Sequence, residues 1–319
     1  MPRWIVIAGA LVVLACPPLG AQPYPSKPIR ILVPYPAGGL VDVVTRTLAE
    51  PLSRNMGQSV LVENRPGGNA VIAHEAVLSS APDGYTWLAA PPAFATNISL
   101  MNLRFDPLKD FAPVARFAVS ADYFFVPVTL GVSSLADYVN LVKSQPGKHN
   151  HGIPGIGGAA HIAFEQFKRA AAIELTGIPY QGAPPIIADL VNSQVTSAFL
   201  PGVVGVPQAK AGKIKVLAAN AAKRQAWMPD VPTFAELGFP EVQAILWVGI
   251  AVPVKTPRDI QQRIAAEIEK AVKEPEFIAR LESVGAEPAY LAPETFEAFI
   301  RKEIDTSGRA IRDAGIKIQ

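Results

Sequence analysis

Two glycine-containing segments of the chain could bind a small anion through backbone amides. In the first, an apolar run at residues 29–33 leads through Tyr35, Ala37, Gly38 and Gly39 into an expected helix. The first amides of a helix have no internal acceptor and lie at the positive end of its dipole, so they favour a carboxylate or a phosphate. Glycine also lets a ligand come close to the backbone. An ordinary strand-to-helix connection is the alternative interpretation.

The second segment repeats the order of strand, glycine loop and helix. It runs from His151 to His161 and contains Gly157, Gly158 and Ala159. It lacks the Lys-Ser/Thr of a P-loop and the spacing of a dinucleotide-binding loop. A flexible loop is the alternative interpretation, but two such segments in two lobes could close on one small anion. We expect both segments, including His161 as a hydrogen-bonding group, to contact a ligand.

Three further residues lie near the ends of expected elements. Tyr180 follows an apolar run at residues 174–178, and Pro201 follows a run at residues 195–200. Either could line the same cleft, although turn chemistry and packing explain them equally well. Asp42 is expected in the first turn of its helix, where an acidic side chain complements the dipole. We assign Asp42 a structural role.

The sequence offers little support for a metal site or for catalysis. Three histidines, His149, His151 and His161, lie near one another, but they form no strong ligand motif. The chain has a single cysteine, Cys16, and no nucleophile elbow or serine beside a recognisable base. We predict no catalytic residue, no metal and no cofactor.

The first residues have the pattern of a secretory signal at 1–21. Arg3 precedes an apolar run at residues 4–16, and small residues lead to a cleavage site after Ala21. Acylation of Cys16 as a lipoprotein is the alternative, although Leu14 is bulky for that motif. We expect simple cleavage, which leaves a periplasmic chain without cysteine or disulfides.

Bulk properties exclude several kinds of partner. The formal net charge is +2, and no basic cluster of the kind that binds nucleic acid is present. Beyond the export segment, no apolar run approaches the ~20 residues that span a bilayer. About 300 residues remain, enough for two domains of ordinary size. Since no heptad or large apolar stripe is readable, we expect a monomer.

Strand-like runs alternate with helical stretches, which predicts an α/β protein. The expected strands are residues 29–33, 60–63, 86–90, 115–126, 149–152, 174–178, 195–200, 214–218 and 245–252. This alternation of strands and helices predicts mainly parallel sheets with helices on both faces.

Two segments are expected to connect two lobes. The apolar run at residues 114–128 is long enough to leave one domain and enter another, and a return crossing is expected at 243–247. The predicted lobes are therefore residues 22–125 with 246–319, and residues 126–245. Ligands of open α/β sheets bind at the carboxyl ends of strands, so the cleft between the lobes is the expected site.

Seven segments together resemble one receptor family. They are residues 33–42, 62–67, 81–86, 106–113, 151–161, 179–182 and 229–233. In this order and spacing the chain resembles the substrate-binding receptors of tripartite tricarboxylate transporters, the Bug family of extracytoplasmic solute receptors. The resemblance covers the chain from about Tyr24 to its end.

The resemblance implies a two-lobed periplasmic-binding-protein fold of the Venus-flytrap kind. It implies a small carboxylate held between the two glycine segments, partly through water, and delivery to the membrane permease subunits of a tripartite tricarboxylate transporter. It implies no catalysis. A ligand-dependent interaction with a membrane sensor kinase is the alternative function.

The chain departs from the family pattern in its polar groups. Similar members of the family usually carry hydroxyl residues in the second loop, where this chain has Ile153, Gly158, Ala159 and Ala160. A position that is often acidic in the family is Thr196 here. The loop at residues 90–94 also has no polar side chain. We expect an unusually apolar cleft, in which an aromatic or branched monocarboxylate binds more tightly than citrate.

Overall fold

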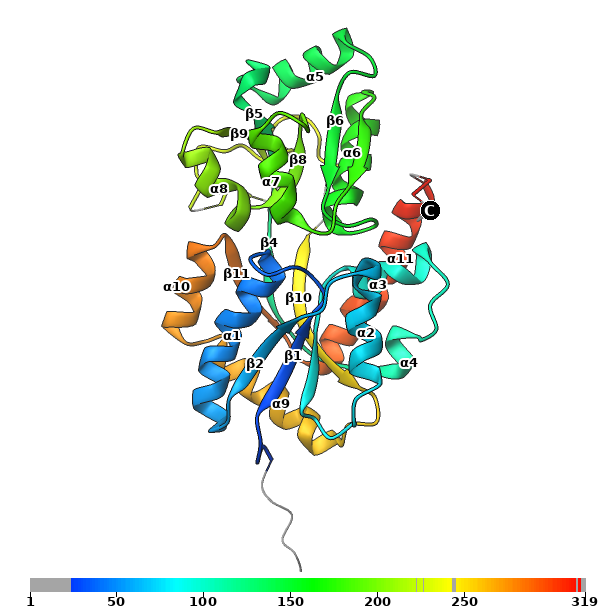
Figure 1. Ribbon diagram of the computed structural model, residues 1–319, viewed down its shortest axis with the longest axis vertical. Helices are drawn as coiled ribbons and strands as arrows, with labels where there is room; N and C mark the ends of the chain where they lie inside the picture. The colour runs from blue at the N-terminus through cyan, green and yellow to red at the C-terminus, as the bar shows by residue number, and fades with distance from the viewer. Residues whose placement is uncertain (1–23, 222, 226, 243–244, 314, 317–319) are drawn as a thin grey trace, which may run out of the picture.

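The computed structural model contains two β-sheets, each surrounded by helices, and the chain crosses between them (Figure 1). The described residues are 24–221, 223–225, 227–242, 245–313 and 315–316. The expected signal at residues 1–21, with Cys16, lies outside them. We call the six-stranded sheet with its helices the first lobe, and the five-stranded sheet with its helices the second lobe.

The first lobe has the strand order β11-β4-β10-β3-β1-β2. Its strands are β1 (Ile29–Val33), β2 (Val60–Asn64), β3 (Thr86–Ala90), β4 (Phe111–Ser120), β10 (Leu246–Pro253) and β11 (Ala286–Leu291). Strand β1 pairs in parallel with β2 and β3, whereas β10 is antiparallel to both β3 and β4, and β11 is antiparallel to β4.

The second lobe has the strand order β7-β6-β8-β5-β9. Its strands are β5 (Asp122–Pro127), β6 (Asn150–Ile153), β7 (Thr176–Pro179), β8 (Ala198–Pro201) and β9 (Ile214–Asn220). Strand β6 is parallel to β7 and β8, and β5 is antiparallel to β8 and β9.

These pairings confirm the two-lobed α/β fold and correct the expectation of mainly parallel sheets. Both sheets are mixed, because the strands next to the crossings, β4, β5 and β10, run antiparallel to their neighbours. The expected continuous strand at residues 115–126 is two strands that meet at Ala121. All of β5 therefore belongs to the second sheet, and the first lobe boundary lies at Ala121 rather than at residue 125.

Helices cover both sheets. They are α1 (Leu40–Met56), α2 (Val71–Leu78), α3 (Ala93–Leu100), α4 (Pro107–Asp110), α5 (Leu135–Ser144), α6 (Ala159–Ala171), α7 (Ala183–Val191), α8 (Gly202–Lys210), α9 (Arg258–Ala271), α10 (Pro275–Ser283) and α11 (Pro293–Asp313), with short 3-10 turns at Gly68–Ala70 and Val128–Leu130. Across the described ranges, no helix combines the length and hydropathy needed to span a bilayer.

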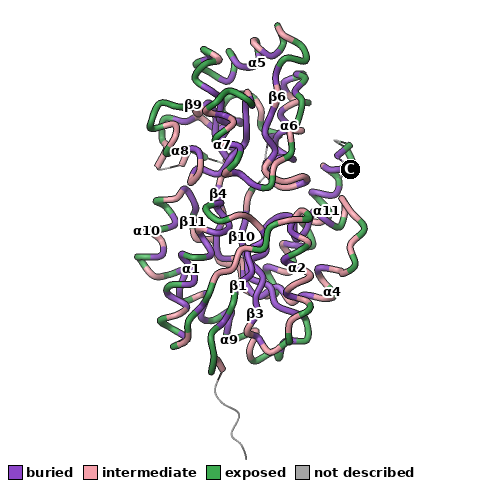
Figure 2. The backbone as a smooth tube through the Cα atoms, viewed as in Figure 1, coloured by how far each residue is buried: buried purple, intermediate pink, exposed green. Residues whose placement is uncertain are grey.

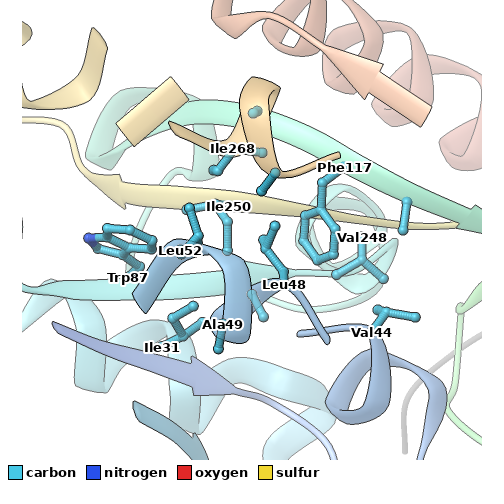
Figure 3. Close-up of a cluster of buried hydrophobic side chains, with 14 of the residues drawn as sticks. Ile31, Val44, Leu48, Ala49, Leu52, Trp87, Phe117, Val248, Ile250 and Ile268 are labelled. Carbon is cyan, nitrogen blue, oxygen red and sulfur yellow. The ribbon is translucent and has the colours of Figure 1, made fainter. Parts of the chain in front are cut away.

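The largest core cluster fixes the direction of α1. Val44, Leu48 and Leu52 recur every four residues along one face of this helix, and all three are fully buried. They pack with Phe117 of β4 and Ile250 of β10 (Figure 3). Figure 2 shows that the strands themselves are mostly buried. The core therefore fixes the start of α1, which is part of the first glycine segment.

The first crossing brings a charged residue to the junction of the lobes. Ser120 ends β4 opposite Leu246 of β10, and Asp122 begins β5 between Pro201 of β8 and Asn220 of β9. In Figure 1, β4 and β10 lie side by side and antiparallel, so that β4 runs toward the second lobe and β10 runs away from it. The predicted return crossing at 243–247 falls partly outside the described residues.

Candidate functional site

The first glycine segment forms a sharp elbow between β1 and α1. Gly38 has φ +80°, in the left-handed region that favours glycine, and Gly39 is the N-cap of α1. No side chain caps this helix, and the Gly39 amide makes only a long hydrogen bond of 3.4 Å to the Pro36 carbonyl. The amides of the first turn thus remain directed out of the helix end.

Asp42 organises this elbow from inside. Its carboxylate accepts hydrogen bonds from the Gly38 amide, Arg46 Nε and Asn64 Nδ2, each at 2.9 Å. Burial raises the pKa of Asp42, but these donors outweigh burial and hold the pKa below its ordinary value. Asp42 therefore has the structural role expected of it, and the Gly38 amide is occupied within the elbow.

The second glycine segment repeats this arrangement before α6. Gly157 has φ +71°, Gly158 is an N-cap without a side-chain cap, and the Gly158 amide bonds to the Gly155 carbonyl at 3.2 Å. The Gly157 amide donates to Nδ1 of His161 at 3.0 Å, four residues ahead, as the Gly38 amide donates to Asp42. Two helices thus begin in the same way, one in each lobe.

His161 is a hydrogen-bonding group within the second elbow, and it is not among the residues that line the chamber described below. Burial and the charge of Lys168 lower the pKa of His161 to about 4, so the ring is neutral at pH 7. Since Nδ1 accepts from Gly157, the ring proton is on Nε2, which lies 3.9 Å from Glu165 Oε1.

Four first-turn residues of these two helices line one chamber between the lobes. They are Leu40 and Val41 of α1 with Ala159 and Ala160 of α6. The chamber has a volume of about 70 Å³. Since one water needs ~10–15 Å³ on this measure, it has room for roughly five to seven non-hydrogen atoms. Two positive helix ends therefore share a space that suits one small anion.

The structure brings half of the predicted ligand residues to this chamber. Those that line it are Tyr35, Gly39, Gly158, Ala159 and Pro201.

The other five predicted residues do not line it. Ala37 is exposed, and the amides of Gly38 and Gly157 are occupied within their elbows, because Asp42 and His161 accept from them. The first-turn amides that face no internal acceptor are those of Leu40 and Val41 in α1, which were not predicted, and those of Ala159, which was predicted, and Ala160 in α6.

Tyr180 lines an outer groove of about 570 Å³, which Tyr35 also lines. Its hydroxyl donates to Asp189 Oδ2 at 2.5 Å. Tyr180 thus lines this groove rather than the chamber, and its hydroxyl is bound within the second lobe.

The lobes touch one another around the chamber. Asn69 Nδ2 donates to the Ile156 carbonyl at 2.8 Å, and a Cβ added to Gly157 would overlap Leu100. On the other side, a Cβ on Gly182 would lie 3.2 Å from Pro36. The structure is therefore a closed arrangement of the two lobes.

The acidic residue of the chamber, Asp122, was not predicted as a site residue. Asp122 is fully buried, and neither of its carboxylate oxygens has a hydrogen-bond partner among the described residues. Burial raises its pKa to about 7. In the sequence, Asp122 is followed by Tyr, Phe, Phe and Val, which indicate a buried strand. This pattern gives no sign that the acid lies at a ligand site.

His149 and His151, the other two histidines of the predicted group, are buried in the second lobe. The His151 ring stacks on Phe164 at 4.3 Å, and its Nδ1 lies 2.9 Å from Ser197 Oγ. His149 is buried, and desolvation lowers the pKa of both rings. Within the part of the chain that the structure describes, no three His, Cys, Asp or Glu side chains are placed to hold a metal ion.

Comparison with known proteins gives consistent matches along the chain. The family described as "Tripartite tricarboxylate transporter family receptor" matches residues 44–316. Protein BugT of Bordetella pertussis is 31% identical over 329 residues, covering 100% of this chain and 99% of BugT. The structure of R. palustris Rpa4515 with adipate has a TM-score of 0.89 at 29% identity, covering 92% of this chain and 100% of that one. MatC from Rhodopseudomonas palustris with bound malate has a TM-score of 0.84 at 27% identity, covering 90% and 100%.

These matches agree with the two-lobed fold. The family match spans most of the chain, and the BugT alignment spans both proteins almost completely. The resemblance noted from seven sequence segments is confirmed. The chain belongs to the receptor family of the tripartite tricarboxylate transporters.

Proposed function

We propose that this protein is a periplasmic receptor that captures a small carboxylate between its lobes for uptake by the permease subunits of a tripartite tricarboxylate transporter. One observation carries the proposal: two helices, one from each lobe, begin without side-chain caps at the same chamber. A ligand that bonds to both helix ends stabilises the closed arrangement, because it gains both sets of contacts only there.

The amides of Leu40, Val41, Ala159 and Ala160 are the proposed carboxylate donors. Each is in the first turn of its helix, where the helix supplies no acceptor. Amides give donors without a cationic side chain, and among the described residues that line the chamber there is no lysine or arginine. The wall is completed by Tyr35, Gly39, Gly158 and Pro201.

The relatives support this class of ligand and this location. Rpa4515 was solved with adipate and MatC with malate, both of which are carboxylates. Another similar structure, 32% identical with a TM-score of 0.88, is described as a periplasmic transporter and is covered completely by this chain. The expected export signal at residues 1–21 agrees with a periplasmic location.

Calorimetry with acid and amide pairs tests the proposal. The protein is unfolded, freed of small molecules, refolded and titrated with small carboxylates and with the corresponding primary carboxamides. A carboxamide keeps the shape of the acid but lacks its charge, so we expect each acid to bind at least ten-fold more tightly. Equal affinities within every pair would overturn the proposal.

A further inference from the structure

Asp122 is a buried acid without a hydrogen-bond donor among the described residues, and it has no evident structural role. It begins β5 at the crossing between the lobes, with Pro201 opposite it on β8. Its side chain is fully buried and lines the chamber, and within the described ranges both oxygens lack a hydrogen-bond donor. Asp42, by contrast, is also buried but receives three donors from its own lobe.

In the part of the chain that the structure describes, the lining of the chamber supplies no hydrogen-bond partner for this carboxyl group. Its other walls are prolines, glycines, alanines, Leu40, Val41, Leu246 and Tyr35. Tyr35 is the other ionisable side chain among the described lining residues, and burial raises its pKa to about 12, so it stays neutral. A buried carboxylate without a partner is costly, and a ligand that donates to it removes that cost.

We propose that Asp122 binds a positively charged amine of the ligand, so that the receptor takes a small amino carboxylate. This inference rests on the proposed function, because it places the ligand carboxylate at the helix ends of α1 and α6. The helix ends and Asp122 line the same chamber, so one short molecule can reach both. An ammonium group also supplies up to three donors for the two oxygens of Asp122.

The same geometry disfavours a dicarboxylate. A second carboxylate would share the chamber with Asp122, and two like charges close together in a space with apolar walls repel each other strongly. The expectation of an apolar monocarboxylate is revised by the same observation. The walls are apolar, as expected, but the chamber also contains one acid that an alkyl or aromatic group would leave unpaired.

Two sets of equally sized ligands test the inference on stripped and refolded protein. Butyrate, 3-hydroxypropionate and 3-aminopropionate differ only in whether a methyl, hydroxyl or ammonium group is placed at the third carbon. Isobutyrate, L-lactate and L-alanine make the same comparison at the second carbon. Each has about six non-hydrogen atoms, which matches the volume of the chamber. Succinate is the dicarboxylate control.

Calorimetry at pH 8 with the wild type and Asp122→Asn gives the readout. In at least one set we expect the amine to bind ten-fold or more tightly than the methyl compound. In Asp122→Asn this advantage should fall below three-fold, while affinity for the methyl compound is retained or improved. Retained affinity for the methyl compound also shows that the variant is folded.

The outcomes separate the inference from the proposed function. If the carboxylates bind without preference for the amine, or if succinate binds best, the role of Asp122 is overturned and the receptor function stands. An amine preference that persists in Asp122→Asn also overturns it. If no carboxylate of either set, nor succinate, binds at millimolar concentration, the proposed function fails as well.

Discussion

Asn69 Nδ2 lies 2.8 Å from the carbonyl oxygen of Ile156, and this hydrogen bond joins the first lobe to the glycine loop of the second. The same side chain donates to Asn97 Oδ1 at 2.7 Å, and Asn97 Nδ2 donates back to the Asn69 carbonyl. Asn69 has φ 49°, in the left-handed region. Asn97 thus supports Asn69 in a conformation that reaches across the cleft.

We expect the substitution Asn69→Gly to weaken ligand binding about three- to ten-fold. Glycine adopts the left-handed conformation freely, so the turn is retained while the bond to Ile156 is lost. One hydrogen bond contributes about 0.5–1.5 kcal/mol, and closure becomes less favourable by that amount. Calorimetry and small-angle scattering measure the effect on affinity and on the radius of gyration. Asn102→Gly, at an exposed position of the same lobe, is the control, and equal affinities of the two variants would contradict the role of Asn69.

The amide of Ala159 can be removed with little disturbance of its helix. Proline is tolerated at the first helical position, and Gly158 before it has φ −72° and ψ 172°, which proline permits. We expect Ala159→Pro to lower carboxylate affinity about ten-fold or more, because a hydrogen bond to a charged group is worth about 1.5–3 kcal/mol. Ala159→Val adds similar bulk but keeps the amide. Calorimetry that gives both variants the same affinity would show that the amide does not bind the ligand.

The sequence was informative about the elbows because their chemistry is local. A strand, glycines and the start of a helix define each elbow without long-range information, so the region of the site could be predicted. The particular amides could not, because Gly38 and Gly157 are occupied by side chains four residues ahead. Sequence spacing alone does not show which of several neighbouring amides faces outward.

The pairing of strands was harder to predict than their positions. An apolar run indicates a buried strand but not the direction of its neighbours. Strand β11 was not predicted at all, since it lies at the edge of its sheet and contains Pro288. Asp122 was missed because its burial and its unpaired state depend on β8 and on the walls of the closed cleft.

Asp122 should destabilise the ligand-free protein at neutral and alkaline pH. Its folded pKa of about 7 lies above the ordinary value of 3.8, so the penalty is absent below pH 4, grows as pH rises to 7 and is complete above it. We expect Asp122→Asn to raise the free energy of unfolding at pH 8 by up to about 4 kcal/mol, with no gain at pH 4. Urea denaturation across this pH range measures it.

Asp42→Asn is the control with the opposite sign. The pKa of Asp42 is lowered in the folded protein, so its carboxylate contributes stability above its ordinary pKa, and that stability is lost as pH falls through the folded pKa. We expect Asp42→Asn to be destabilised at pH 8 and less so in acid. A gain in stability for both variants at pH 8 would contradict the assigned environments.

His161 should make the protein sensitive to acid. Its folded pKa of about 4 lies below the ordinary 6.5, so stability is lost as pH falls from 6.5 to 4, by about 3 kcal/mol. In His161→Asn, Oδ1 can accept from the Gly157 amide in place of Nδ1 without titrating. Denaturation curves at pH 7 and pH 4 give the free energy of unfolding at each pH. Between these pH values, His161→Asn should lose about 3 kcal/mol less of this free energy than the wild type does. His161→Ala, which leaves the amide unbonded, should be less stable at both pH values, and an identical acid loss in wild type and His161→Asn would contradict the account.

Mass spectrometry of the small molecule released when freshly purified protein is denatured tests the central claim most directly. The account predicts one equivalent of a molecule that carries a carboxylate, together with an amine that pairs with Asp122. Release of a molecule with a carboxylate but no amine would retain the receptor function and reject the role of Asp122. A bound molecule with no carboxylate would contradict the claim that the two helix ends form a carboxylate site.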